Sequence, residues 1–143
     1  MVSRGQIYNR TFATQQIDYS GLWYPGNITP TDIDGVCSGG PVDRARGFID
    51  FSSRLFIFME FKYRKSEPPY GQILAFERLI DNCMIPAYYF ICGHEYPPEE
   101  DILAHLTIVF RVRSNWIKKA WLSVPDINLK SCIDRLRIRW GVS

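Results

Sequence analysis

The sequence predicts an α/β protein with a mixed central β-sheet flanked by helices. Short apolar segments of strand length alternate with segments of helical periodicity, the order expected when helices cover a sheet. Residues 55–63 form one of these apolar segments and are hydrophobic on both faces as far as Met59, as in a central strand. The 143 residues, 46% hydrophobic and 15% aromatic, suffice for a single domain with a substantial core.

The first third of the chain is irregular in pattern. Residues 7–24 are weakly patterned, and we expect a helix there that is followed by an extended stretch. Residues 27–36 predict an extended segment, in which a period of two places Asp32 and Asp34 on one face. Glycines, a proline and mixed charges predict a loop over residues 37–47.

The middle of the chain carries the clearest elements. A strand is expected at residues 47–51, and the polar residues 52–54 form a turn into the apolar strand. Two prolines then introduce a helix over residues 70–83, whose apolar positions recur at helical spacing. These positions are Ile73, Phe76, Ile80 and Cys83.

The last third of the chain predicts two strands and a helix. The apolar segments 86–92 and 103–112 have strand length and composition. Asp126 is expected to cap the final helix. The apolar positions of this helix are Ile127, Leu129, Ile133 and Leu136.

Charge is distributed unevenly along the chain. The net formal charge of +2 combines −4 over residues 1–110 with +6 over residues 111–143. Tryptophans 116, 121 and 140 are interleaved with the basic residues, a composition that is compatible with a phosphate-rich partner. The alternative interpretation is a solvated surface. The residues expected to contact nucleic acid are Arg111, Arg113, Lys118, Lys119, Arg135, Arg137 and Arg139.

Cysteines and targeting signals exclude several classes of protein. The four cysteines are 46, 9 and 40 residues apart, which matches no common zinc-binding spacing. The first ten residues lack the apolar core of a signal peptide, and the longest apolar run is too short to span a membrane. We therefore expect a cytoplasmic protein with reduced thiols and no membrane partner.

Two charged residues at the end of the apolar strand are the main anomaly of the sequence. Glu60 and Lys62 share one face of a strand expected to be buried on both sides. An unpaired buried charge is costly, so each residue requires a partner or a ligand. One interpretation is a self-contained Glu–Lys ion pair.

The other interpretation is a metal site. Asp34 supplies a second carboxylate, and a divalent cation would relieve the repulsion between the two carboxylates. Oxygen ligands without His or Cys favour Mg²⁺ or Mn²⁺ over zinc. Lys62 would then orient or deprotonate a water molecule. Gln72 faces the core side of the predicted helix and requires hydrogen-bond partners there.

The series Asp34-Gly35, Glu60-Phe61-Lys62 and Gln72 resembles the motif of the PD-(D/E)XK nuclease superfamily, particularly its small stand-alone phage-type members. The resemblance covers roughly residues 27–92. It implies a restriction-endonuclease-like core with Asp34, Glu60 and the backbone carbonyl of Phe61 as metal ligands. It also implies Lys62 as the residue that positions or activates water, and Gln72 beside the site.

The chain departs from the family pattern in two places. Asp34 and Glu60 are 26 residues apart, a long separation that makes Asp50 a rival for the first carboxylate. Many members carry a glutamate on an N-terminal helix, whereas residues 1–31 contain none, and Gln15 or Gln16 would take its place.

The function expected from these features is a Mg²⁺-dependent DNA nuclease that cuts internally or at branched structures such as four-way junctions. It would act in the cytoplasm, the host's if the protein is phage-encoded. Resemblance to junction-resolving nucleases suggests a homodimer. One alternative is a non-catalytic nucleic-acid-binding module. The other is a protein-interaction domain, whose contacts would be Trp23, Tyr24 and Trp121.

Overall fold

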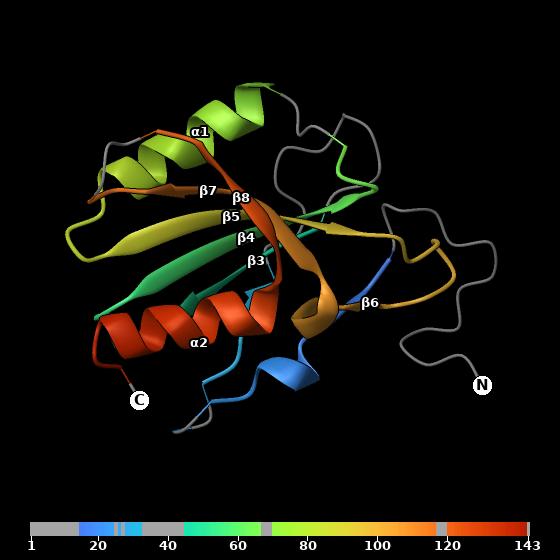
Figure 1. The fold of residues 1–143 in the computed structure, drawn as a ribbon, viewed down its shortest axis with the longest axis horizontal. Coiled ribbons are helices and arrows are strands. Elements are labelled where there is room, and N and C mark those ends of the chain that lie inside the picture. The colour runs from blue at the N-terminus through green and yellow to red at the C-terminus, as the bar shows by residue number, and fades with distance from the viewer. Residues whose placement is uncertain are drawn as a thin grey trace.

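A computed structural model describes residues 15–24, 26, 28–32, 45–66, 70–116 and 120–142. The described chain folds as a mixed α/β protein, which confirms the predicted class (Figure 1). Its elements are β1 (Ile17–Asp18), η2 (Ser20–Leu22), β2 (Thr31–Asp32), β3 (Ala45–Asp50), β4 (Phe56–Tyr63), α1 (Tyr70–Asp81), β5 (Ala87–His94), β6 (Ile102–Leu103), η3 (Ala104–Leu106), β7 (Ile108–Ser114), β8 (Leu122–Asn128) and α2 (Leu129–Arg139).

Most described strands form a single six-stranded sheet of order β2-β3-β4-β5-β7-β8. The pairs β2–β3 and β3–β4 are antiparallel, β4–β5 is parallel, and β5–β7 and β7–β8 are antiparallel. A parallel pair cannot be joined by a tight turn, and α1 makes the connection from β4 to β5. The short strands β1 and β6 form a separate parallel pair.

The sheet separates two apolar clusters. On one face, Phe76 and Ile80 of α1 pack with Phe58, Tyr89 and Ile91. On the other face, α2 packs against the odd-numbered positions of β4 and the even-numbered positions of β5. The helices therefore cover opposite faces, as Figure 1 shows, and β4 is buried on both sides. This arrangement confirms the prediction that residues 55–63 form a covered central strand.

A tight turn joins β3 to β4 and sets their register. The Phe51 N–H donates to the Leu55 carbonyl, and Ser52 and Ser53 have φ values of 55° and 60°. The Ser53 N–H donates to Asp50 Oδ1 over 2.8 Å, which stabilises these left-handed conformations. Counting outward from the turn places Arg46 directly opposite Glu60.

Other predictions are confirmed within a few residues. The expected turn at residues 52–54, the helix at 70–83 and the strand at 86–92 correspond to the β3–β4 turn, α1 and β5. The extended segment at 27–36 is confirmed at β2, and residues 33–36 lie outside the described part. In the described residues 15–24, the expected helix is absent, and β1 and η2 are found instead.

Two predictions in the last third were wrong. The start of the segment 103–112 forms β6 and η3, so that β7 begins only at Ile108. Asp126 does not cap the final helix, because residues 122–128 form β8. Asn128 is the cap, and its side chain accepts a hydrogen bond from the Ser131 N–H. Pro125 makes this segment unlike a strand, but a proline is tolerated in an edge strand such as β8.

None of the helices in the described part of the chain combines the length and the apolar character that a membrane span requires.

Candidate functional site

Glu60 and Lys62 lie in the second half of β4, on the face that α1 covers. Their side chains are 0% and 2% exposed, respectively. Both belong to a strand flanked by β3 and β5, with Glu60 beside Ile91 and Lys62 beside Gly93. The sequence prediction of two buried charges on one face is therefore confirmed.

One oxygen of the Glu60 carboxylate is held by residues from both neighbouring strands. Tyr89 Oη donates a hydrogen bond of 2.6 Å to Glu60 Oε1. Arg46 Nε lies 3.7 Å from the same oxygen, and the Arg46 side chain is itself buried. The Arg46 guanidinium also lies 5.2 Å from the centre of the Phe76 ring of α1. Glu60 is thus fixed in place by β3 and β5 together.

Tyr89 is enclosed by aromatic side chains. Its ring packs edge-on against Phe58, Phe76 and Trp121. This burial raises the pKa of Tyr89 well above the ordinary value of 10.0, and the charge of Glu60 raises it further. The phenol therefore stays protonated and remains a hydrogen-bond donor to Glu60.

The second carboxylate oxygen of Glu60 suits a metal ion. Glu60 Oε2 is buried and accepts no hydrogen bond from the described residues. However, the described residues contain no group of three His, Cys, Asp or Glu side chains that could hold a metal ion. Asp34 lies outside the described part of the chain. Among the described residues, Glu60 therefore fits one carboxylate ligand of a metal site. Asp34 stays a prediction for the second carboxylate ligand.

Phe61, a predicted metal ligand, and Gln72, predicted to lie beside the site, have different surroundings. Phe61 is paired with Ala45 on one side and Cys92 on the other, so its carbonyl belongs to a central strand. Its role as a metal ligand stays a prediction. Gln72 lies in the first turn of α1, and its side chain lies outside the described part of the structure.

Asp50 does not qualify as the rival first carboxylate. It pairs with Phe56 at the start of β4, four residues before Glu60. Four residues of strand correspond to about 13 Å. The Asp50 side chain is exposed and accepts the Ser53 N–H in the turn. Asp50 is therefore a turn residue in this structure, and Asp34 as the first carboxylate stays a prediction.

Gln15, one of the two glutamines expected to replace an N-terminal glutamate, points its side chain toward the loop before β6. Gln15 Nε2 donates to the carbonyls of Tyr96, Pro97 and Glu100 over 2.9–3.0 Å. The Gln16 carbonyl accepts from the N–H of the first residue of β6. Gln15 therefore secures the loop before β6 and does not add a polar group beside Glu60.

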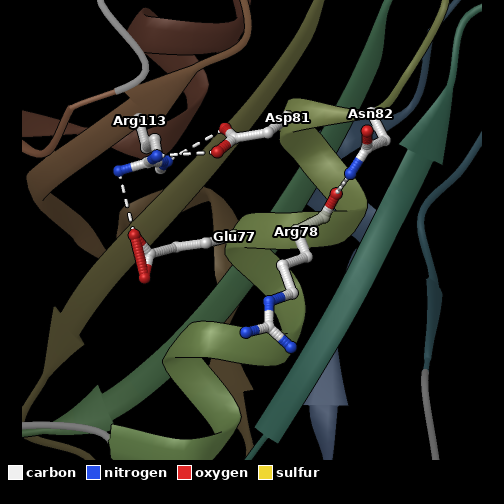
Figure 2. A network of polar contacts seen from close by, with 5 residues as sticks. All are labelled: Glu77, Arg78, Asp81, Asn82 and Arg113. Carbon is white, nitrogen blue, oxygen red and sulfur yellow. Dashed lines mark hydrogen bonds and ion pairs between the residues drawn. The ribbon is translucent and has the colours of Figure 1, made fainter.

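Arg113, which was expected to contact nucleic acid, has acidic partners within the fold. Its guanidinium donates to both oxygens of Asp81 over 2.7 and 3.0 Å and lies 2.9 Å from Glu77 (Figure 2). The hydrogen bonds to Asp81 raise the pKa of Arg113 further. With a side chain only 11% exposed, Arg113 ties β7 to α1, and its charge is used within the fold.

The remaining basic residues do not form one patch. Arg111 lies on the face that α1 covers, with its guanidinium 4.9 Å from the centre of the Trp121 ring. Arg135, Arg137 and Arg139 belong to α2, on the other face. Lys118 and Lys119 lie outside the described residues. Nucleic-acid contact by these basic residues stays a prediction.

The α2 arginines pack against aromatic rings. Arg137 lies 4.5 Å from the centre of the Tyr24 ring, and Arg139 lies 4.3 Å from that of Trp116. Tyr24 is buried, and Trp121 is partly buried against the cluster that contains Tyr89. Of the three aromatic residues expected to contact a protein partner, Trp23 is the most exposed at 59%.

A cavity of about 350 Å³ lies where β4 and β5 end. Its lining includes Arg64 and Lys65, which follow β4, and Gly93, His94 and Glu95 from the end of β5. Of these lining residues, Gly93 is the neighbour of Lys62 across the parallel pair of β4 and β5. A side chain at Gly93 would collide with the Lys65 side chain at 2.9 Å.

Sequence reasoning missed Arg46 and Tyr89. Arg46 could have been found, because the turn at residues 52–54 fixes the register that places it opposite Glu60. Tyr89 carried no such signal. Its hydrogen bond depends on the parallel register of β4 and β5, which are separated by α1.

Comparison with known proteins gave no match, either to a family model, to a curated protein or to a solved structure. The fold and the site together define a mixed α/β protein with a buried carboxylate and a buried amine side by side on a central strand.

Proposed function

We propose that the protein is a Mg²⁺-dependent DNA nuclease with a restriction-endonuclease-like core. The observation that supports this proposal best is the buried pair on β4. Glu60 and Lys62 are almost fully buried on one face, and Glu60 Oε2 accepts no hydrogen bond from the described residues. A buried carboxylate oxygen without a donor is costly, and a ligand would remove this cost.

The topology also supports the proposal. The meander β2–β3–β4, the crossover through α1 and the parallel strand β5 form a mixed sheet whose strand β4 carries Glu60, Phe61 and Lys62. The C-terminal halves of β4 and β5 lie together, a place where ligands bind in sheets of this kind.

The proposed residues have separate roles. Glu60 and Asp34 would hold Mg²⁺ or Mn²⁺, with the Phe61 carbonyl as a further ligand. A bound divalent cation supplies charge neutralisation for phosphodiester cleavage. Lys62 would orient the attacking water by donating a hydrogen bond, and Gln72 would lie beside the site. Arg46 and Tyr89 act as positioning residues, because they hold Glu60 Oε1.

DNA is the proposed substrate, cut internally or at branched structures. Basic side chains bind its phosphates without reading sequence. A homodimer would present two sites to two strands. Because DNA is the substrate, we place the activity in the cytoplasm, which is the host's if the protein is phage-encoded.

A second candidate is a nucleic-acid-binding module without catalytic activity. The observation that favours it is the state of Glu60 Oε1, which already accepts the Tyr89 hydroxyl and lies near the Arg46 guanidinium. These contacts balance part of the carboxylate charge without a metal ion. In such a module, metal ions would not alter DNA binding.

Cleavage assays distinguish the two candidates. Labelled single-stranded, duplex, flapped and four-way-junction DNA would be incubated with Mg²⁺, Mn²⁺ or EDTA. Metal-dependent cleavage is expected, with losses of about 100-fold or more in Glu60→Gln, Lys62→Met and Asp34→Asn. The matched control is Asp50→Asn, which removes an exposed acid of the same sheet and should cleave like the wild type.

Circular dichroism and urea unfolding would show that each variant is folded. Failure of the wild type to cut any of the four substrates with either metal ion would refute the nuclease. DNA binding by the same preparation, unchanged by EDTA, would then favour the binding module.

A further inference from the structure

A β-bulge in β7 redirects one basic residue toward the candidate site. Ile91 of β5 pairs with Arg111, whereas the next residue, Cys92, pairs with Val109, so Phe110 is an extra residue. Val109 packs in the cluster on the α2 face, and Phe110 packs in the cluster on the α1 face. Because of the bulge, the consecutive residues Phe110 and Arg111 both have their side chains on the face of the sheet that α1 covers. Bulges often re-aim side chains next to active sites.

Arg111 lies in the same row of the sheet as Glu60. Glu60 pairs with Ile91, and Ile91 pairs with Arg111, so two strand spacings separate the two residues. Two spacings correspond to about 10 Å. The Arg111 guanidinium lies 4.9 Å from the Trp121 ring, and that ring lies 4.9 Å from Tyr89, which bonds to Glu60.

Trp121 carries a buried hydrogen-bond donor that is not used by any residue the structure describes. Its Nε1 atom is buried and has no hydrogen-bond partner among the described residues. The indole N–H groups of two other tryptophans have acceptors. Trp116 Nε1 and Trp140 Nε1 donate hydrogen bonds of 2.6 and 2.9 Å to Tyr88 Oη. An unsatisfied buried donor destabilises the fold, which points to a ligand acceptor at Trp121.

We infer that Arg111 and Trp121 form a contact for a phosphodiester group of a bound nucleic-acid strand, beside Glu60. The guanidinium supplies positive charge, and the indole N–H supplies a hydrogen bond to a phosphate oxygen. This inference rests on the proposed function, because it takes DNA as the ligand. It adds the residues that contact the strand and places them about two strand spacings from Glu60.

Fluorine NMR of the full chain labelled with 5-fluorotryptophan tests the inference. The resonances would be assigned with the variants Trp23→Phe, Trp116→Phe, Trp121→Phe and Trp140→Phe. A short single-stranded oligonucleotide and a duplex would be titrated at low salt in EDTA, so that binding is observed without cleavage. We expect the Trp121 resonance to shift. A shift of the Trp116 resonance alone would overturn the inference.

Measurements of oligonucleotide affinity provide a second test of the Arg111–Trp121 contact. Arg111→Ala should weaken oligonucleotide binding roughly tenfold and reduce the slope of log affinity against log salt by about one. Trp121→Phe keeps an aromatic side chain and removes the N–H donor, and should weaken binding several-fold. The control Arg54→Ala removes an exposed arginine of the β3–β4 turn and should bind like the wild type. Wild-type affinity in Arg111→Ala would refute the contact.

Inorganic phosphate, titrated alone, should move the Trp121 resonance at much higher concentration than the oligonucleotide does. Movement by phosphate but by neither oligonucleotide would refute the nucleic-acid assignment. The cleavage assays and these binding measurements test the nuclease and the strand contact separately. If the Trp121 resonance shifts but no DNA is cleaved, the contact is supported and the protein is a nucleic-acid-binding module. Cleavage by a protein whose Trp121 and Arg111 do not respond would refute the contact alone.

Discussion

Tyr89 Oη donates a hydrogen bond of 2.6 Å to Glu60 Oε1 from the neighbouring parallel strand, and both residues are buried. The bond joins a neutral phenol to a carboxylate in the protein interior, where such bonds are short and strong. It fixes the orientation of the carboxylate on which the proposed metal site depends.

A double-mutant cycle measures this bond. Tyr89→Phe should lower the free energy of unfolding by about 1.5–3 kcal/mol, because it leaves the Glu60 oxygen without its donor. In the background of Glu60→Gln the same change should cost at least about 1 kcal/mol less. Urea unfolding of the four proteins supplies the values, and additive effects would contradict a direct coupling.

Stability should fall at alkaline pH. Burial raises the pKa values of Tyr89 and Cys92 above their ordinary values of 10.0 and 9.0. Above these ordinary values the unfolded chain releases protons that the folded chain retains, so unfolding becomes more favourable as pH rises. Each group contributes about 1.4 kcal/mol per pH unit.

The measurement is urea unfolding between pH 7 and pH 11. Tyr89→Phe should show a shallower decline above pH 10, because one of the retained protons is removed. Equal slopes in the wild type and this variant would show that the Tyr89 phenol ionises normally in the folded state.

Arg113→Ala should destabilise the fold by about 2–4 kcal/mol, because it leaves Glu77 and Asp81 as unpaired, largely buried carboxylates (Figure 2). The control is Arg64→Ala, whose ion pair with Glu95 has side chains 66% and 79% exposed. This control should change stability by less than about 0.5 kcal/mol. Thermal unfolding of both variants, with similar losses in each, would contradict a structural role specific to Arg113.

Gly21 and Gly71 should respond to alanine in opposite directions. A Cβ atom at Gly21 would collide with the His105 ring, so Gly21→Ala should cost about 1–3 kcal/mol. A Cβ atom at Gly71 meets nothing within 4 Å, and Gly71 lies in α1. Gly71→Ala should therefore stabilise by about 0.5–1 kcal/mol. Melting temperatures that move in the same direction would argue against the packing of His105 on Gly21.

The cap of α2 is tested by two neighbouring variants. Asn128→Ala removes the acceptor for the Ser131 N–H and should cost about 1 kcal/mol. Asp126→Ala removes only an exposed ion pair with Lys65 and should cost less than about 0.5 kcal/mol. Chemical unfolding decides between them, and a larger loss in Asp126→Ala would restore the cap expected from the sequence.

Local patterns were enough to predict the central strand and the first helix. β4 is apolar on both faces, and α1 has apolar residues at helical spacing after two prolines, so neither depends on distant residues. β8 could not be predicted in this way. Pro125 disfavours a strand, and only the pairing with β7 and the position at the sheet edge make the segment extended.

The partners of the basic residues near the end of the chain also could not be predicted from local sequence patterns. Arg111 and Arg113 are two residues apart, yet Arg111 lies on Trp121 while Arg113 binds Glu77 and Asp81. Composition predicts a positively charged segment but not which of its charges are already used. The acidic partners come from α1, which precedes the segment by more than 30 residues.

The sequence by itself determined that this is an α/β protein with two charges buried on its central strand, because the alternation along a strand decides which side chains share a face. Only the tertiary structure decided what those charges meet. The register of β3 brings Arg46 to Glu60, and the parallel register of β5 brings Tyr89 to the same oxygen. Partners on different strands are set by sheet pairing between segments distant in the chain, which local sequence patterns do not encode.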